Sequence, residues 1–228
     1  MKILQISTYD RAGGAEKVAL DLHRTYKALG HDARLLVRDR RTDETGVVAL
    51  NPYTNIAPWG DLCAGAERSV AAWPRFRGQG RLQDLLRRLA LPQRLIDAAR
   101  GVEDFNYPAS HAIASGEWRP DLVHAHNLHG DFFDLRALAE VSAQVPVIWT
   151  LHDAWAMTGH CAYPISCERW RTGCGNCPDL RRPPAIARDA TAENWARKAA
   201  IYAQSRLAVA TPSQWLMGLV EASMVQAT

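Results

Sequence analysis

A histidine and an aspartate, His152 and Asp153, follow closely on the apolar run at positions 145–149. The run Val-Pro-Val-Ile-Trp is typical of a buried parallel strand, because a strand covered on both faces need not alternate apolar with polar residues. The two polar side chains are therefore expected just beyond the carboxyl end of a strand, where open α/β sheets bind ligands. An imidazole there can hydrogen-bond a hydroxyl group or transfer a proton near neutral pH. The alternative is that the pair only caps the following turn.

Polar residues also end a strand that is predicted over 121–126. Alternation along this strand turns His124 and His126 to the same face, and it leaves Asn127 and His129 in the loop at the carboxyl end. Three histidines resemble a metal site, but no carboxylate or cysteine completes a ligand pattern here. We expect ligand contacts from His126, Asn127 and His129, with hydrogen-bonded structural histidines as the alternative.

A glycine pair, Gly13 and Gly14, lies between the first predicted strand and the first predicted helix. Free backbone N–H groups and the positive end of the helix dipole favour an anion at such a position, and glycine lets a ligand approach the backbone closely. Paired glycines also simply form tight turns, so both interpretations stay open. The pattern is not the G-x-G-x-x-G dinucleotide fingerprint, and no Walker lysine follows it.

Four of the five cysteines lie within seventeen residues, with His160 beside the first of them. They are Cys161, Cys167, Cys174 and Cys177. Four thiolates can close a tetrahedral zinc site, although only one C-x2-C pair occurs here. Buried or free thiols and disulfides are the alternatives, and reducing cytosol disfavours disulfides. A catalytic cysteine is not expected, because the sequence places no base beside one, and the isolated Cys63 predicts a small buried residue.

Strands and helices alternate around these residues. A strand over 2–7, a helix over 15–29 and a strand over 31–38 together predict a βαβ unit with a right-handed crossover. The later strands and helices are predicted over 121–126, 131–141, 145–150, 192–205, 206–210 and 213–225. This order predicts the α/β class, with one Rossmann-like, doubly wound parallel sheet that fills the chain.

The stretch 51–116 interrupts the alternation with prolines and glycines among short helical patterns. We expect an insertion of short helices and loops rather than a second domain. Within it, the segment 68–100 carries eight arginines and two aspartates, interleaved with apolar residues. A basic amphipathic segment of this kind can lie on an anionic membrane surface. A solvated helical face over a core stripe has the same pattern.

The composition is that of an ordinary soluble protein, with 228 residues of which 47% are hydrophobic and 22% charged. A net charge of +3 is too small to indicate a nucleic-acid partner. No apolar run reaches the roughly 18 residues of a transmembrane helix, and the first residues turn polar too soon for a signal peptide. We expect a cytoplasmic protein, with peripheral contact at the inner face of the membrane through 68–100.

Taken together, these residues resemble the amino-terminal half of a family-4 glycosyltransferase of the GT-B fold. The matching segments are the glycine loop, the two strand ends with histidines, and the last strand and helix, at 6–18, 121–127, 150–153 and 210–216. The segment 155–180, with Cys-Gly-Asn-Cys-Pro at 174–178, resembles a subgroup that builds bacterial exopolysaccharide and lipid-linked oligosaccharide.

The resemblance implies transfer of a sugar, of the hexosyltransferase type, from a nucleotide-sugar (UDP- or GDP-sugar) to a glycan or lipid-linked glycan, with retention at the anomeric carbon. The family requires no cofactor for catalysis, so a zinc ion at the cysteines is expected to be structural. By resemblance, His152 and Asp153 are the catalytic residues, and His152 contacts the transferring sugar. Substrate contacts are implied for Gly13, Gly14, Glu16, His126, Asn127 and His129.

The resemblance also implies a carboxyl-terminal donor-binding domain with two glutamates eight residues apart. No two glutamates of this sequence have that spacing. We therefore interpret residues 1–228 as the acceptor-side domain, with an insertion at 51–116 and a Cys-rich loop at 154–185, truncated before the donor domain and inactive alone. A non-catalytic, zinc-stapled binding module is the alternative. Another nucleotide-binding enzyme is disfavoured, because the G-x-G-x-x-G pattern is missing.

Overall fold

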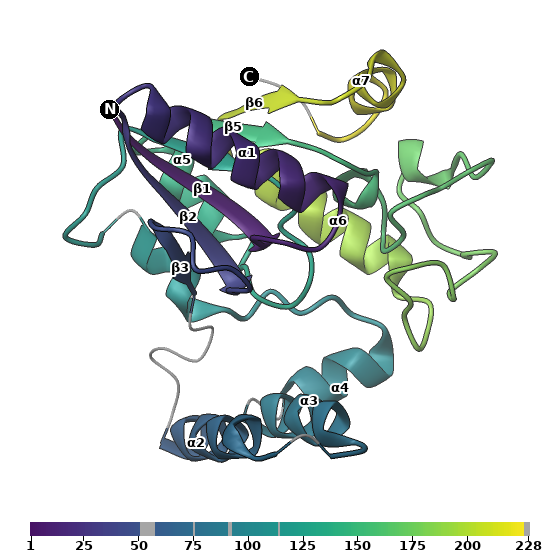
Figure 1. The fold of residues 1–228 in the computed structure, drawn as a ribbon. Helices are drawn as coiled ribbons and strands as arrows, with labels where there is room; N and C mark the ends of the chain where they lie inside the picture. The colour runs from purple at the N-terminus through teal and green to yellow at the C-terminus, as the bar shows by residue number, and fades with distance from the viewer. Residues whose placement is uncertain (51–57, 75, 91–92, 114, 226–228) are drawn as a thin grey trace.

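A single parallel sheet organises the chain in the computed structural model, which describes residues 1–50, 58–74, 76–90, 93–113 and 115–225. Its strand order is β3-β2-β1-β4-β5-β6, and all neighbours run parallel (Figure 1). The strands are β1 (Lys2–Tyr9), β2 (Asp32–Asp39), β3 (Val47–Ala49), β4 (Leu122–Ala125), β5 (Val147–Thr150) and β6 (Leu207–Ala210). This order is that of a doubly wound, Rossmann-like sheet, which confirms the predicted fold class.

Helices cover both faces of the sheet, and they are α1 (Gly14–Ala28), α5 (Ala137–Ser142), α6 (Thr191–Tyr202) and α7 (Gln214–Glu221). Successive residues of a strand point to opposite faces. On one face, Leu35 and Val37 of β2 pack against Ala19 of α1. On the other face, Leu4 and Ile6 of β1 belong to the main core, together with residues of α5 and α6. Burial on both faces explains the nearly continuous apolar runs of the strands.

Between β3 and β4, where an insertion of short helices and loops was expected over 51–116, the described residues form a helical segment, and residues 51–57, 75, 91–92 and 114 lie outside the description. The segment contains α2 (Pro58–Ala72), α3 (Gln79–Ala90), α4 (Gln93–Arg100) and the 3-10 helix η1 (Pro108–Ile113). Figure 1 shows α2 and α3 side by side, away from the sheet. Cys63 is buried between them with Ala64 and Ala90, as expected for a small apolar residue.

The structure differs from the prediction in two places. The strand β3 was not predicted, because it has three residues and two of them are exposed, so it carries no clear apolar pattern. The helix predicted over 131–141 begins only at Ala137. Asp131 has a left-handed backbone with φ of 61°, and the Asp134 carboxylate accepts the Arg136 backbone N–H at 2.9 Å, so a turn replaces the first part of the helix.

The Cys-rich loop between β5 and α6 has little regular structure. Its helical parts are two 3-10 helices, η2 (Trp155–Met157) and η3 (Arg169–Arg171). The loop packs closely on the start of α6, since a Cβ added to Gly159 would lie 2.3 Å from the Thr191 carbonyl oxygen. Glycine is therefore required at position 159. None of the helices in the described part of the chain has the length and apolar character needed to cross a bilayer.

Candidate functional site

The carboxyl ends of β1, β4 and β5 lie at one edge of the sheet, and each leads into a loop with predicted site residues. The chain order reverses between β1 and β4, because β1 continues to β2 on one side and β4 to β5 on the other. Such a switch point leaves a crevice beyond the strand ends. At this edge the structure brings His126 next to His152, and His129 next to Asp153.

His126 lies behind His152 and fixes its orientation. The Nδ1 atom of His126 is 3.2 Å from the Nε2 atom of His152, and the two rings are stacked. On its other side, the Nε2 atom of His126 lies 3.4 Å from the amide nitrogen of Gln5, which also donates to the Ala19 carbonyl oxygen at 3.0 Å. Because an amide nitrogen only donates, His126 accepts at Nε2, carries its proton on Nδ1 and donates to His152. Nδ1 of neutral His152 then carries a proton for a ligand.

Burial keeps these histidines neutral. Desolvation, together with neighbouring imidazoles, lowers the pKa of His126 to about 2 and that of His124 to about 4. Burial also lowers the pKa of His152, although the charges of Asp153 and Glu16 partly oppose the shift. His124 is held by the Tyr26 hydroxyl and by the Thr150 hydroxyl at 3.1 and 2.8 Å, so its role is structural.

His126 is fully buried, so its ring does not reach the surface at this edge of the sheet. Its neighbours in the loop are tied to the end of β1, because the Thr8 hydroxyl donates to the carbonyl oxygens of His129 and Asn127 at 2.9 and 3.3 Å. The sequence placed His126, Asn127 and His129 in one group, but only tertiary contacts separate the buried ring of His126 from the partly exposed ring of His129.

Asp153 has protein partners for both carboxylate oxygens. One oxygen accepts the Trp155 backbone N–H at 2.9 Å, and the other lies 3.1 Å from the Nε2 atom of His129. The first contact is the turn cap that the sequence left open as an alternative. Asp153 therefore orients the loop and His129, and its charge acts on His152 from a distance.

The glycine pair opens the amino terminus of α1 to solvent. The Gly13 N–H donates to the carboxylate of Glu16 at 2.9 Å, so the mostly buried Glu16 caps the helix. Neither glycine has the left-handed backbone that requires glycine. A Cβ added to Gly14 would meet nothing within 4 Å. The fold therefore does not explain glycine at position 14, which is exposed to solvent.

Comparison with known proteins places this arrangement in a family. The family model "Glycosyltransferase Family 4" matches residues 12–221. The chain belongs to glycosyltransferase family 4. A relative from Escherichia coli (strain K12), named as the colanic acid biosynthesis glycosyl transferase WcaC, is 36% identical over 77 residues. That alignment covers 31% of this chain and 19% of the relative, so it spans less than a fifth of the longer protein.

A second feature of this family-4 domain is a cavity of about 350 Å³ beside His129. Its wall combines residues of the insertion, among them Glu103, Asp104 and Tyr107, with His129 and Trp155. Four residues of this wall were not predicted from the sequence, namely Glu103, Asp104, Tyr107 and Trp155. The irregular stretch 101–107 carries no periodic pattern, and the one available signal was the acidic pair at 103–104.

A buried ion pair supports this cavity from behind. Lys198 of α6 is completely buried, and its ammonium group lies 2.9 Å from the carboxylate of Glu103. It also donates to the carbonyl oxygens of Trp155 and Thr158 at 3.0 and 3.1 Å. The Trp155 indole N–H donates to Glu103 at 2.9 Å. Burial lowers the pKa of Lys198, while Glu103 opposes the shift. These contacts join the insertion, the Cys-rich loop and α6.

The four clustered cysteines line a separate small cavity. All four are free thiols. Burial raises the pKa of Cys161, and it raises that of Cys174 to about 11, so both are poor nucleophiles at neutral pH. Among the residues that the structure describes, no three His, Cys, Asp or Glu side chains are arranged as a metal site.

Proposed function

We propose that this family-4 domain is the acceptor-side half of a retaining glycosyltransferase. The enzyme transfers a sugar, of the hexosyltransferase type, from a UDP- or GDP-sugar to a hydroxyl group of a glycan or lipid-linked glycan, with no cofactor in the chemical step. The family membership supports the reaction class. The name of the Escherichia coli relative supports a place in exopolysaccharide synthesis.

The observation that carries the proposal is the setting of His152. It is half-buried at the crevice between β1 and β4, and His126 holds it from behind. Since His126 donates to Nε2, the neutral ring offers its Nδ1–H to a ligand. A neutral donor of this kind suits an oxygen of the transferring sugar, because it stabilises the oxocarbenium-like state without placing a positive charge beside it.

The acceptor sugar is proposed to bind in the cavity beside His129. Glu103, Asp104 and the Trp155 indole line the cavity together with His129, and an aromatic wall with a few polar groups is typical of ligand pockets. Its volume of about 350 Å³ is in the range of ligand pockets. Direct contacts of the acceptor with Asn127 and His129 agree with their position at the end of β4.

The donor diphosphate is proposed to approach Gly14 at the start of α1, where the helix dipole and free N–H groups favour an anion. Most donor contacts then come from a second half-domain with the paired glutamates of the family, which have no counterpart in this sequence. On this proposal the chain alone is inactive, because the two substrates must be held together.

Titration calorimetry with UDP and GDP tests whether the donor nucleotide binds mainly to the second half-domain. We expect no detectable binding to the 228-residue chain and clear binding to a longer form that adds the donor half. The same pair of forms, assayed for sugar transfer, should differ in the same way. Tight binding of either nucleotide to the short chain would show a self-contained nucleotide site and would contradict the proposal.

We further propose that the insertion contacts an anionic membrane, where lipid-linked acceptors lie. Large apolar side chains of the insertion are exposed to solvent, namely Trp59, Leu62, Trp73, Phe76, Leu85 and Ile96. Exposed arginines at 68, 77, 81 and 100 accompany them. Apolar and basic side chains together favour an interfacial position.

Two arginines of the predicted basic segment are not part of this surface. Arg94 does not belong to it, because it is buried 2.5 Å from the Asp104 carboxylate. Arg75 lies outside the described residues.

Sedimentation with phosphatidylcholine vesicles, with and without phosphatidylserine, tests the membrane contact. We expect binding at low salt to the vesicles with phosphatidylserine, and roughly tenfold weaker partition for Trp73→Ser, since an indole contributes one to a few kcal/mol when it leaves water. Trp215→Ser is the matched control, because Trp215 is similarly exposed but lies on α7. Equal partition of the two variants, or no binding at low salt, would end this proposal.

A further inference from the structure

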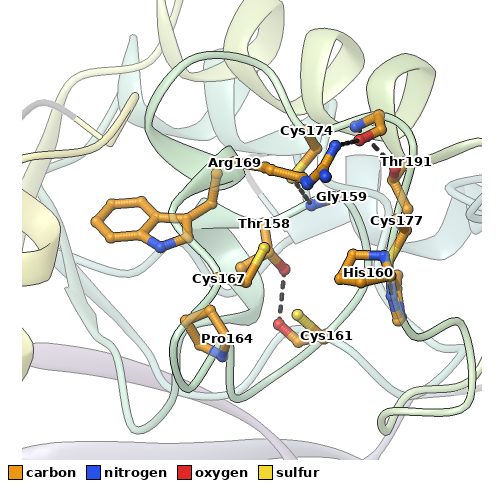
Figure 2. Close-up of a pocket in the computed structure, with 13 residues that line it drawn as sticks. Thr158, Gly159, His160, Cys161, Pro164, Cys167, Arg169, Cys174, Cys177 and Thr191 are labelled. Carbon is orange, nitrogen blue, oxygen red and sulfur yellow. Dashed lines mark hydrogen bonds between the residues drawn. The ribbon is translucent and has the colours of Figure 1, made fainter.

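The Cys-rich loop closes around a cavity of about 20 Å³ that the proposed reaction does not use. Figure 2 shows the clustered cysteines and His160 around this space. A volume of this size holds one small occupant, comparable to one water molecule. A cavity that collects four thiols and an imidazole differs from an ordinary apolar packing defect, because every one of these groups is a metal ligand.

The ring of His160 is oriented as metal-bound histidines are. Its Nδ1 atom lies 2.9 Å from the carbonyl oxygen of Pro184, so Nδ1 carries a proton and donates it. The Nε2 atom then carries the lone pair, and it accepts a hydrogen bond from the Cys177 thiol at 3.3 Å. Metal-bound histidines usually donate their other N–H to a carbonyl or carboxylate in this manner.

The backbone around Cys174 and Cys177 is held in an uncommon conformation. Gly173, Cys174, Gly175 and Asn176 all have positive φ, and for the two residues with side chains this conformation is unfavourable. Contacts with the start of α6 maintain it, because Gly175 N–H donates to the Thr191 hydroxyl at 2.9 Å and Cys177 N–H donates to Asp189 at 2.6 Å. The left-handed turn directs both cysteines toward one cavity.

Backbone and charge also suit bound thiolates. The Gly159 N–H donates to the sulfur of Cys174 at 3.2 Å, a contact that favours a negatively charged sulfur. Arg169 lines the same cavity, and its positive charge offsets that of thiolates. The loop lacks strands and α-helices of its own, so a bound ion can supply the stabilisation that a hydrophobic core gives elsewhere.

We propose that this cavity binds one structural zinc ion. Cys161, Cys167 and Cys174 supply three corners of the tetrahedron, and the adjacent pair Cys177 and His160 supplies the fourth. Each binding thiol releases its proton to solvent as a zinc–sulfur bond forms. The side chains must turn inward from their present positions, since they do not stand as a closed ligand set. Zinc suits this site better than an iron–sulfur cluster, because the cavity holds only one small occupant.

Metal analysis of the full 228-residue chain, purified without chelator, tests the proposal. We expect one zinc ion per chain by elemental analysis and by native mass spectrometry. After chelation, zinc added alone should restore this content and raise the melting temperature. Bound zinc should also protect the clustered cysteines from thiol alkylation. It should not protect Cys63, which reacts whenever α2 and α3 unfold locally. This test does not depend on the proposed transferase activity.

Single substitutions distinguish the proposed zinc ligands from Cys63, the cysteine outside the cluster. Cys161→Ser, Cys167→Ser and Cys174→Ser should each lose the zinc ion, whereas Cys63→Ser should keep it, because Cys63 is buried between α2 and α3. Loss of zinc from only one of Cys177→Ser and His160→Gln would assign the fourth corner. A wild-type chain without zinc, even after zinc is added, would overturn the proposal. Iron in place of zinc, or intact masses that show disulfides among these cysteines in cytosolic extracts, would also overturn it.

Discussion

Replacement of His152 by alanine is expected to lower kcat about a hundredfold in a form of the enzyme that carries both half-domains. On the proposed function, the variant loses the Nδ1–H donor of the neutral ring to the transferring sugar, and one lost transition-state contact of this kind costs roughly 2.7 kcal/mol. His152 is half-buried at the crevice, so the substitution should have little effect on folding. The measurement is the initial rate of transfer at saturating donor and acceptor, together with the melting temperature of each variant.

The control for this prediction is a substitution of Gln5, which contacts His126 and not His152. Gln5→Leu removes the amide N–H that holds the Nε2 atom of His126, so His126 can exchange its proton between the two nitrogens. We expect a smaller loss, of about tenfold in kcat with an unchanged acceptor KM, and a mixed tautomer signal of His152 by nitrogen NMR. Gln5 is a positioning residue, because it is fully buried and acts through His126. Wild-type turnover in His152→Ala would remove the catalytic role from this residue.

Replacement of Glu103 by alanine is expected to lower the free energy of unfolding by about 3–5 kcal/mol, because it leaves the ammonium group of Lys198 buried without a carboxylate. Lys198 is completely buried, and Glu103 also accepts the Trp155 indole N–H, so the loss extends to the wall of the proposed acceptor cavity. The measurement is urea unfolding of both proteins at pH 7, followed by fluorescence and circular dichroism.

The double variant Glu103→Leu with Lys198→Met shows whether charge is the cause. It removes both charges and should recover most of the stability that Glu103→Ala loses, since apolar residues often replace a buried pair without loss. Asp21→Ala is the matched surface control, because it removes the carboxylate of the exposed Lys17–Asp21 pair, and it should change stability little. A Glu103→Ala protein as stable as the wild type would show that Lys198 loses its charge or reaches water.

The fold followed from the sequence wherever the pattern is local. The apolar runs at 2–7, 121–126 and 145–150 predicted β1, β4 and β5, because a strand buried on both faces has several consecutive apolar residues. The polar residues that follow each run predicted the edge of the sheet at which His126 and His152 lie together. Neither β3 nor the turn before Ala137 was predicted, because a short exposed strand and a side-chain cap have no periodic pattern.

Contacts between distant parts of the chain were decided only by the tertiary structure. The sequence by itself determined the family, the parallel sheet, and which loops carry histidines and cysteines. Only the folded chain buried His126 behind His152, joined Glu103 to Lys198 across 95 residues, and aimed the ring of His160 at Cys177. The physical reason is that backbone periodicity is a property of neighbours along the chain. Burial, protonation and ligand geometry depend instead on which groups the sheet and its loops bring together.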